Sequence, residues 1–424
     1  MSACKIAIWH RYGPAAHAEI NHSLVFLIEE LARTCEIHYF GTRSRQPIPA
    51  AIADNARIHR LPFALNRSST LSVRLATFLW YLSVPFMALK CRFMRMDAVY
   101  IEESLPLIPF LVRVFYGHNT VATVADFFAR VYLEKTFLLK PLCKLVELID
   151  FAVWRRLPLI FTKVKHTKDF LVQNGVDARR IHPIYNPCSP EIYFPRDKHE
   201  CRQAFNIPDE SIVLVHHGIL HPNKGNALII QALADLAVEF PSLRYLLVGS
   251  GPEEKQLKSL SEELQITDMV IFTGWLKTQK EVNTALNAAD IGLVMRIGQS
   301  TDHFHVTDTL THEMACGLPI LAVNLKGIAE VIREEETGLL FDSGNMEQFK
   351  DKLKRLVNEP GLREKLGKSA LETGRKLFDP QKVAERTAAP LLELVRSNES
   401  AIATKRHEKT QKGRKNFTQD QQDK

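Results

Sequence analysis

The residues best suited to chemistry lie in the second half of this 424-residue chain, in the segment VHHGILHPNKGNALIIQAL. Gly218 ends an apolar run there, and Lys224 and Gly225 open a pattern typical of a helix. Backbone N–H groups at a helix start and a flexible ammonium both favour an anion, so this loop is a candidate phosphate site. An ordinary strand-to-helix loop with a surface lysine accounts for the same residues equally well.

A second candidate is the polar loop 300–309, which contains His305 and Thr307 and precedes a helix carrying His312 and Glu313. Hydroxyl and N–H groups of such a loop can bind a diphosphate, and a carboxylate one turn further on can accept hydrogen bonds from ribose hydroxyls. The alternative is that His312 and Glu313 are helix-surface residues without a ligand. The nearby LLVGSGPEEKQL lacks the third glycine of a dinucleotide fingerprint and is interpreted as a simple turn.

Short apolar runs alternate with helical patterns around these candidates, as a parallel sheet covered on both faces requires. Five weaker runs in the first half predict a second domain of the same kind: 5–9, 36–40, 97–101, 120–125 and 158–161. Six runs in the second half predict its strands: 212–215, 243–248, 270–273, 291–295, 320–323 and 338–341. The fold class is therefore α/β with two doubly wound domains. We place them at 1–190 and 212–378, with a Pro-rich, charged linker at 191–211.

Charge is distributed unevenly along the chain. Residues 1–194 carry 24 Lys and Arg against 15 Asp and Glu, a net charge of +9, whereas the whole chain has +7. Such a basic half can face an anionic lipid, a phosphorylated acceptor or nucleic acid, or can be only a solvated surface. Seven scattered cysteines without a CxxC pair argue against a disulfide framework or a zinc site, and the N-terminus lacks the long apolar core of a signal peptide. We expect a cytoplasmic protein.

Residues 71–96 are strongly apolar, but Pro85 interrupts them and the span between Arg74 and Lys90 is too short to cross a bilayer. A buried helix and a helix lying in a membrane interface both fit this pattern. From residue 399 the chain is basic and almost free of apolar residues, and we expect a disordered tail over 399–424.

Beyond these patterns, the sequence resembles glycosyltransferase family 4. HHGILHPNKG, LLVGSGP, VIFTGWL, AADIGLVM, EMACGLPILAV and ETGLLF occur in the family's order and spacing over residues 212 to about 378. The resemblance implies a GT-B architecture, with a sugar-donor site in the second domain, an acceptor site in the first, and a last helix (379–398) crossing back to the first domain. It also implies transfer with retention of anomeric configuration and without a metal. No Asp-x-Asp pair, which a metal bridge would need, occurs in the chain.

The resemblance assigns roles to individual residues. Gly218, Lys224, Gly225, Trp275, His305, Thr307, His312 and Glu313 would bind the nucleotide sugar, and Lys224, Asp126 and His10 would be catalytic. No cofactor is implied, because a UDP-, GDP- or ADP-sugar would be the substrate. The partners implied are a glycan or lipid-linked acceptor and, through the basic half, an anionic membrane, rather than nucleic acid.

Three positions depart from the family. Ile219 stands where an arginine is usual, and Ala125 stands where a histidine precedes the aspartate matching Asp126, so that His10 or His118 is left for the acceptor side. Many members of the family carry two glutamates eight positions apart. Without a gap these positions align with Phe304 and His312 of this chain, and after a one-residue shift with His305 and Glu313. A binding or assembly subunit without transfer activity, or less readily a nucleotide-sugar epimerase, therefore stays open beside a transferase.

Overall fold

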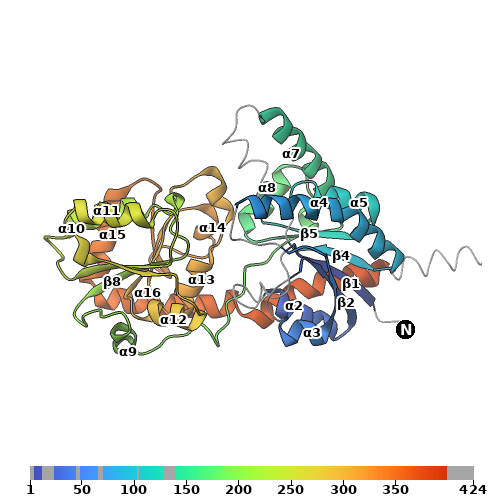
Figure 1. Ribbon diagram of the computed structural model, residues 1–424. Helices are drawn as coiled ribbons and strands as arrows, with labels where there is room; N and C mark the ends of the chain where they lie inside the picture. Colours follow the sequence, from blue (N-terminus) through green and yellow to red (C-terminus); the bar gives the residue numbers. More distant parts are fainter. Residues whose placement is uncertain are drawn as a thin grey trace, which may run out of the picture.

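The protein has two α/β domains, each built on a parallel sheet, as the sequence predicts (Figure 1). The computed structural model describes residues 4–11, 23–43, 48–64, 70–102, 105–125, 127 and 139–398. Asp126 and residues 399–424 lie outside this part of the chain.

The N-terminal sheet has seven strands in the order β3-β2-β1-β4-β5-β6-β7. They are β1 Cys4–Trp9, β2 Cys35–Gly41, β3 Ala56–Arg60, β4 Ala98–Ile101, β5 Thr120–Val124, β6 Leu159–Thr162 and β7 Ile181–Pro183. The helices are α2 Ser23–Ala32, α3 Ala50–Asn55, α4 Thr70–Phe93, α5 Ile108–Phe115, α7 Lys140–Trp154 and α8 Lys165–Gln173. The sequence analysis did not predict β3 and β7, because the short strands ARIHR and IHP lack the continuous apolar run of a central strand.

The C-terminal sheet has six parallel strands in the order β10-β9-β8-β11-β12-β13. They are β8 Ile212–His217, β9 Leu243–Val248, β10 Val270–Gly274, β11 Ile291–Val294, β12 Ile320–Val323 and β13 Gly338–Phe341. The helices are α9 Lys198–Gln203, α10 Asn226–Leu236, α11 Glu254–Glu263, α12 Gln279–Asn287, α13 Asp308–Ala315, α14 Lys326–Ala329, α15 Met346–Asn358 and α16 Pro360–Leu377. All six strands fall on the predicted runs, because a strand buried on both faces is apolar at consecutive positions.

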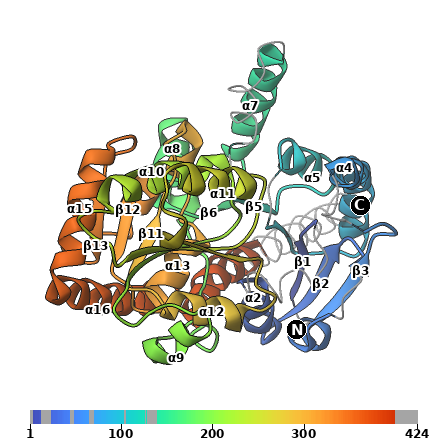
Figure 2. The same cartoon turned by 60° about the vertical axis from the view of Figure 1, so that its left-hand side comes forward.

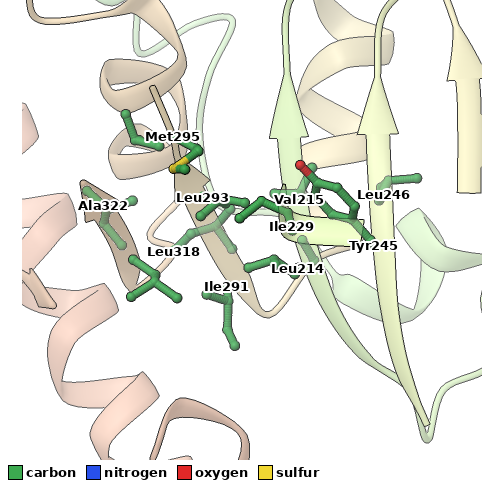
Figure 3. Close-up of a cluster of buried hydrophobic side chains, with 14 of the residues drawn as sticks. Leu214, Val215, Ile229, Tyr245, Leu246, Ile291, Leu293, Met295, Leu318 and Ala322 are labelled. Atoms are coloured by element: carbon green, nitrogen blue, oxygen red, sulfur yellow. The ribbon is translucent and has the colours of Figure 1, made fainter. Parts of the chain in front are cut away.

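Side chains on both faces of this sheet form the core of the C-terminal domain. Leu214, Tyr245, Leu246 and Leu293 are completely buried and interdigitate with Ile229 of α10 and with Leu318, which precedes β12 (Figure 3). Close packing of this kind fixes the strand ends that carry the loops of the candidate site.

The two domains are joined by several contacts besides the linker. Residues 380–398 are helical and place Val383, Leu391 and Val395 in the core of the N-terminal domain. Figure 2 shows this last helix, in dark red, beside α2. The Glu330 carboxylate, directly after α14, accepts hydrogen bonds from the backbone N–H groups of Lys165 and His166 at the start of α8. A carboxylate at a helix N-terminus is favoured by the helix dipole, so Glu330 holds the two sheets in a defined relation.

One cysteine pair departs from the expectation that the chain has no disulfides. Cys4 and Cys35 lie opposite each other on β1 and β2, with a Cα–Cα distance of 4.6 Å, and form a disulfide. The pairing depends on the register of two strands and is not visible in the spacing of the cysteines. The five other cysteines are free thiols.

Candidate donor site

The candidate site is built where β8 and β11 end. Parallel strands present their carboxyl ends at one edge of a sheet, and ligands of doubly wound domains bind there, at the point where the strand order reverses. β8 and β11 are the neighbours between which the order reverses in the C-terminal sheet. Gly218 follows β8 and Arg296 lies two residues beyond β11.

Glycines let the loops at this edge approach one another closely. Gly218 and Gly249 have φ angles of +129° and +137°, which side chains other than glycine rarely adopt. A Cβ atom on Gly249 would lie 2.1 Å from the Gly218 carbonyl oxygen. The turn in LLVGSGP therefore packs directly on the Gly218 loop, which is consistent with its interpretation as a turn.

Lys224 ends a short 3₁₀ turn, Pro222–Lys224, and Gly225 adopts the left-handed conformation that starts α10. The Ile297 N–H donates to the Asn223 carbonyl oxygen over 3.1 Å, and this bond ties the loop after β11 to the Lys224 turn. Burial and the nearby Arg296 guanidinium lower the pKa of Lys224 to about 8. Two cations therefore lie near each other in a half-buried place.

Arg296 is one residue of the site that the sequence analysis did not name. Its guanidinium pairs with Asp302 over 2.8 Å, but its buried Nε has no hydrogen-bond partner in the described residues. A visible signal was present, since Arg296 comes directly after the apolar run IGLVM at a strand end. Ile219, which stands where the family usually has an arginine, is 57% exposed.

The N-terminus of α13 closes the site on the side of Gly218. The Thr307 hydroxyl caps α13 by accepting from the Leu310 N–H, and the Thr309 hydroxyl donates to the His217 carbonyl oxygen over 3.0 Å. Asp308, the first residue of α13, accepts a hydrogen bond from the Asn186 amide over 3.2 Å. Burial raises the pKa of Asp308, and the Lys163 and Lys224 ammonium groups oppose that rise.

Asp308 is therefore close to a cation from each domain. Lys163 follows β6 of the N-terminal sheet and pairs with Glu102 over 3.1 Å. Glu102 also accepts a hydrogen bond from the Tyr100 hydroxyl, and its backbone N–H donates to the Trp9 carbonyl oxygen. Tyr100, Glu102 and Lys163 line a pocket together with Thr123 of β5 and Thr387 of the last helix. The sequence analysis named none of Glu102, Asp308 and Lys163 as a site residue.

The predicted acceptor-side residues are placed as follows. His10 is buried and follows β1, next to the strand end that carries Glu102. His118 lies before β5, at the amino end of that strand and therefore at the opposite edge of the parallel sheet. Asp126 lies outside the described residues.

His312 and Glu313 point in different directions from α13. The His312 ring stacks on Tyr193 with a centroid distance of 3.7 Å, and its Nδ1 shares a 3.0 Å hydrogen bond with His217 Nε2. Burial lowers the pKa of both histidines to about 3, so the pair is neutral near neutral pH. Within the part of the chain that the structure describes, Glu313 is completely buried and neither carboxylate oxygen has a hydrogen-bond partner.

The Glu313 side chain is enclosed in the core and not exposed to a donor, unlike the donor-binding position predicted for it. A Cβ on Gly292 of β11 would lie 2.7 Å from Glu313 Oε2, so the missing side chain at position 292 makes the room that Glu313 occupies. His312 is thus the member of the pair that stays at the edge of the core. Phe304, which the ungapped alignment places at the family's first glutamate, is buried between the domains and packs on Phe127 and His166.

Two predicted donor residues lie further out. Trp275 follows β10 and is 68% exposed, which leaves its ring accessible to a planar base. His305 follows the 3₁₀ turn Ser300–Phe304 and is half-buried against Gly327 of the α14 loop. Among the described residues, no group of three or more His, Cys, Asp or Glu side chains is arranged to hold a metal ion.

Comparison with known proteins identifies the domain that carries this site. Residues 197–373 match the family described as glycosyl transferases group 1. The C-terminal domain resembles the group 1 glycosyl transferases. The match begins just before α9 and ends within α16, so it contains Lys224, Arg296 and α13.

Relatives of the group 1 domain have named transferase or synthase activities. The chain is 27% identical over 220 residues to N-acetyl-alpha-D-glucosaminyl L-malate synthase of Bacillus anthracis, covering 52% of this chain and 55% of that protein. It is 29% identical to a GDP-mannose-dependent monoacylated alpha-(1-6)-phosphatidylinositol monomannoside mannosyltransferase of Corynebacterium glutamicum, covering 46% and 48%. The chain thus spans about half the length of these curated relatives.

The fold of the whole chain resembles that of solved GT-B glycosyltransferases. HepE of Anabaena, in a crystal structure with UDP, superposes with a TM-score of 0.69 at 16% identity, covering 92% of this chain and 100% of that one. At this identity the likeness shows the fold alone. The predicted GT-B architecture is confirmed.

The buried carboxyl group of Glu313 predicts a pH-dependent stability. Burial raises the pKa of Glu313 well above 4.5, so the folded state keeps a proton that the unfolded state releases. Folding stability from this group falls as the pH rises above about 4.5, by at most about 1.4 kcal/mol per pH unit. The free energy of unfolding of Glu313→Gln, measured with urea and compared with that of the wild type, should therefore be more favourable at pH 8 than at pH 5. Exposed Glu262→Gln is the control, and an equal pH dependence in wild type and Glu313→Gln would contradict the assignment.

Proposed function

We propose that the protein transfers a sugar from a nucleotide-sugar donor to a glycan or lipid-linked acceptor. The observation that carries the proposal is the pair of half-buried cations, Lys224 and Arg296, beside the N-terminus of α13 in a group 1 domain. A nucleoside diphosphate is the anion that best suits two cations and a helix N-terminus together.

This pair would act on the leaving group. When the bond to the anomeric carbon breaks, that carbon becomes positively charged and the diphosphate gains negative charge. Lys224 and Arg296 would stabilise that charge at fixed positions, in a place where solvent screens it little. We extend the proposal to transfer without a metal ion, since the two cations provide the charge that a metal would otherwise supply. Transfer with retention is proposed from the resemblance to glycosyltransferase family 4.

The rest of the donor would lie along the same edge of the sheet. Trp275 is suited to stack on the base, and the backbone of Gly218 would allow the diphosphate to approach β8 closely. His312 is the candidate for the ribose, because Glu313 is enclosed in the core. Its neutral ring can exchange hydrogen bonds with a hydroxyl at the nitrogen that His217 does not use.

The acceptor would bind at Glu102 and Lys163. They lie at the carboxyl ends of β4 and β6, and Lys163 is near Asp308 of the donor domain. A carboxylate there can accept a hydrogen bond from an acceptor hydroxyl and orient its oxygen toward the donor. The mannosyltransferase relative named above acts, by its name, on a phosphatidylinositol mannoside, which favours a lipid-linked acceptor here as well.

A binding or assembly subunit without transfer activity is the second candidate. It is favoured by Phe304, which is buried between the domains, and by His312, which stacks on Tyr193, since the ungapped alignment places both at positions of family glutamates. A panel of UDP-, GDP- and ADP-sugars with a lipid and glycan extract separates the candidates. Release of nucleoside diphosphate with labelled acceptor indicates a transferase, and donor binding without release indicates a subunit. A changed sugar without acceptor would indicate an epimerase.

Removing either cation tests the placement of the diphosphate. Lys224→Ala and Arg296→Ala should each lower the rate of transfer on the order of a hundredfold, as loss of one charge stabiliser typically does. Lys255→Ala changes an exposed lysine of the same domain and should leave the rate unchanged. An unchanged rate in Lys224→Ala would place the diphosphate elsewhere.

The lowered pKa of Lys224 predicts how UDP binding depends on pH. Because the ammonium group of the free protein loses its proton above about pH 8, the affinity for UDP should fall as the pH rises from 8 to 9.5. Calorimetric titrations should show that this fall is absent in Lys224→Ala. Parallel slopes in the two proteins would show that another group controls the titration.

Glu102→Gln tests the acceptor side separately. It keeps the size of the side chain but removes the charge, so UDP affinity should stay within about twofold while transfer falls about tenfold or more. Asp54→Asn, an exposed carboxylate of α3, is the matched control. Loss of UDP affinity in Glu102→Gln, or full transfer activity, would contradict an acceptor role.

A further inference from the structure

Helix α4 has two apolar faces, and only one of them is buried. Trp80, Val84, Met87, Ala88 and Cys91 pack into the core of the N-terminal domain. A second row is open to solvent, with exposed fractions from 37% at Leu89 to 85% at Phe93. Its members are Leu75, Phe78, Leu82, Phe86, Leu89 and Phe93. We call this row the α4 stripe.

The spacing of the α4 stripe places all its members on one side of the helix. Successive members are three or four residues apart, and at about 100° per residue they fall within roughly a quarter of the circumference, opposite the buried face. At about 1.5 Å per residue the stripe is about 27 Å long. Single exposed apolar residues are normal on a protein surface, but a continuous row of this length marks an interaction surface.

Exposed apolar side chains continue onto the neighbouring helices. Phe110 and Val114 of α5 are exposed, as are Leu142, Leu145 and Leu148 of α7. The Tyr81 hydroxyl of α4 bonds the carbonyl oxygen of Pro106 next to α5, and the Leu107 N–H bonds Asp150 of α7. Figures 1 and 2 show these three helices on one face of the N-terminal sheet, opposite α2 and α3, with α7 extending away from the domain.

The charge beside the α4 stripe is of one sign. Residues 70–96 contain four Lys or Arg and no Asp or Glu. Exposed Arg74 and Arg92 flank the stripe on one side and exposed Lys90 on the other. Apolar side chains bordered by cations match a bilayer with anionic headgroups, in which the apolar row enters the acyl boundary and the cations stay at headgroup level.

We propose that α4, with α5 and α7, docks the N-terminal domain on an anionic lipid membrane. No described helix is long and apolar enough to cross a membrane, and α4 would lie in the plane of the interface. The inference concerns the surface of the proposed acceptor domain, and it rests on the proposed function only for its purpose, which is to bring the acceptor pocket to a lipid-linked substrate.

Vesicle co-sedimentation of the full chain tests the proposal without donor or acceptor. The protein should bind phosphatidylcholine vesicles that contain about a third phosphatidylglycerol, and bind phosphatidylcholine alone at least tenfold less. Raising the salt from about 0.05 to 0.5 M should weaken binding to the anionic vesicles. No binding to anionic vesicles at low salt would overturn the proposal.

Matched variants locate the binding surface. Phe86→Glu should lower the fraction bound about tenfold, whereas Val238→Glu, at a position 97% exposed in the donor domain, should not change it. Arg74→Ser with Arg92→Ser should lower binding to anionic vesicles, and Lys368→Ser with Arg375→Ser on α16 should not. Circular dichroism checks that each variant is folded. Equal vesicle binding by Phe86→Glu and the wild type would overturn the proposal. It would also be overturned if the wild type formed a dimer, did not bind vesicles, and became a monomer in the Phe86→Glu variant, because the α4 stripe would then be a protein interface.

UDP titration of the same preparations separates this proposal from the proposed function. Retained UDP binding without vesicle binding overturns only the membrane surface. Vesicle binding that depends on Phe86, in a protein that neither binds UDP nor transfers sugar, overturns only the proposed function.

Discussion

The fold holds two cations, Lys224 and Arg296, near each other in a half-buried place. Lys224 and Arg296 repel each other, and their partial desolvation adds to the cost, as the lowered pKa of Lys224 shows. The Asp302 carboxylate forms an ion pair with Arg296. The Asp308 carboxylate interacts with Lys163 of one domain and Lys224 of the other. Two cations that their own carboxylates neutralise only in part are stabilised by an incoming anion, and a diphosphate would supply the missing negative charge.

Rigid backbone packing keeps the cations there. Gly249 lies against the Gly218 carbonyl, the Ile297 N–H bonds the Lys224 turn, and the Thr309 hydroxyl ties α13 to the end of β8. The second domain is fixed by Glu330 at the start of α8 and by Phe304 between Phe127 and His166. These contacts bring Lys163 and Lys224, from the two domains, near the same carboxylate, Asp308, where the proposed donor and acceptor groups would meet.

The sequence predicted features with a local signal and missed those that depend on register or on a partner domain. Buried strands such as IVLV and ILAV are continuous apolar runs and were predicted, whereas edge strand ARIHR is polar on alternate positions and was missed. Lys224 could be named because a glycine-started helix follows it. Asp308 acquires its importance only from Lys163 in the other domain, which no local pattern shows.

Periodicity could have resolved the two neighbouring residues of α13. Glu313 lies three positions after Leu310 and next to Met314, both of which are fully buried, so the helical period places Glu313 on the core face and His312 toward its edge. An alignment of motif residues carries no information about the face of the helix on which each residue lies. The glycine at position 292, which creates the space for Glu313, lies on a strand far away in sequence.

The most direct test of the central claim is a crystal structure with UDP or a UDP-sugar bound. The account predicts that the diphosphate lies at the N-terminus of α13, with oxygens within hydrogen-bond distance of Lys224 Nζ and the Arg296 guanidinium. A nucleotide bound with its phosphates away from both cations, or bound in the N-terminal domain, would contradict it.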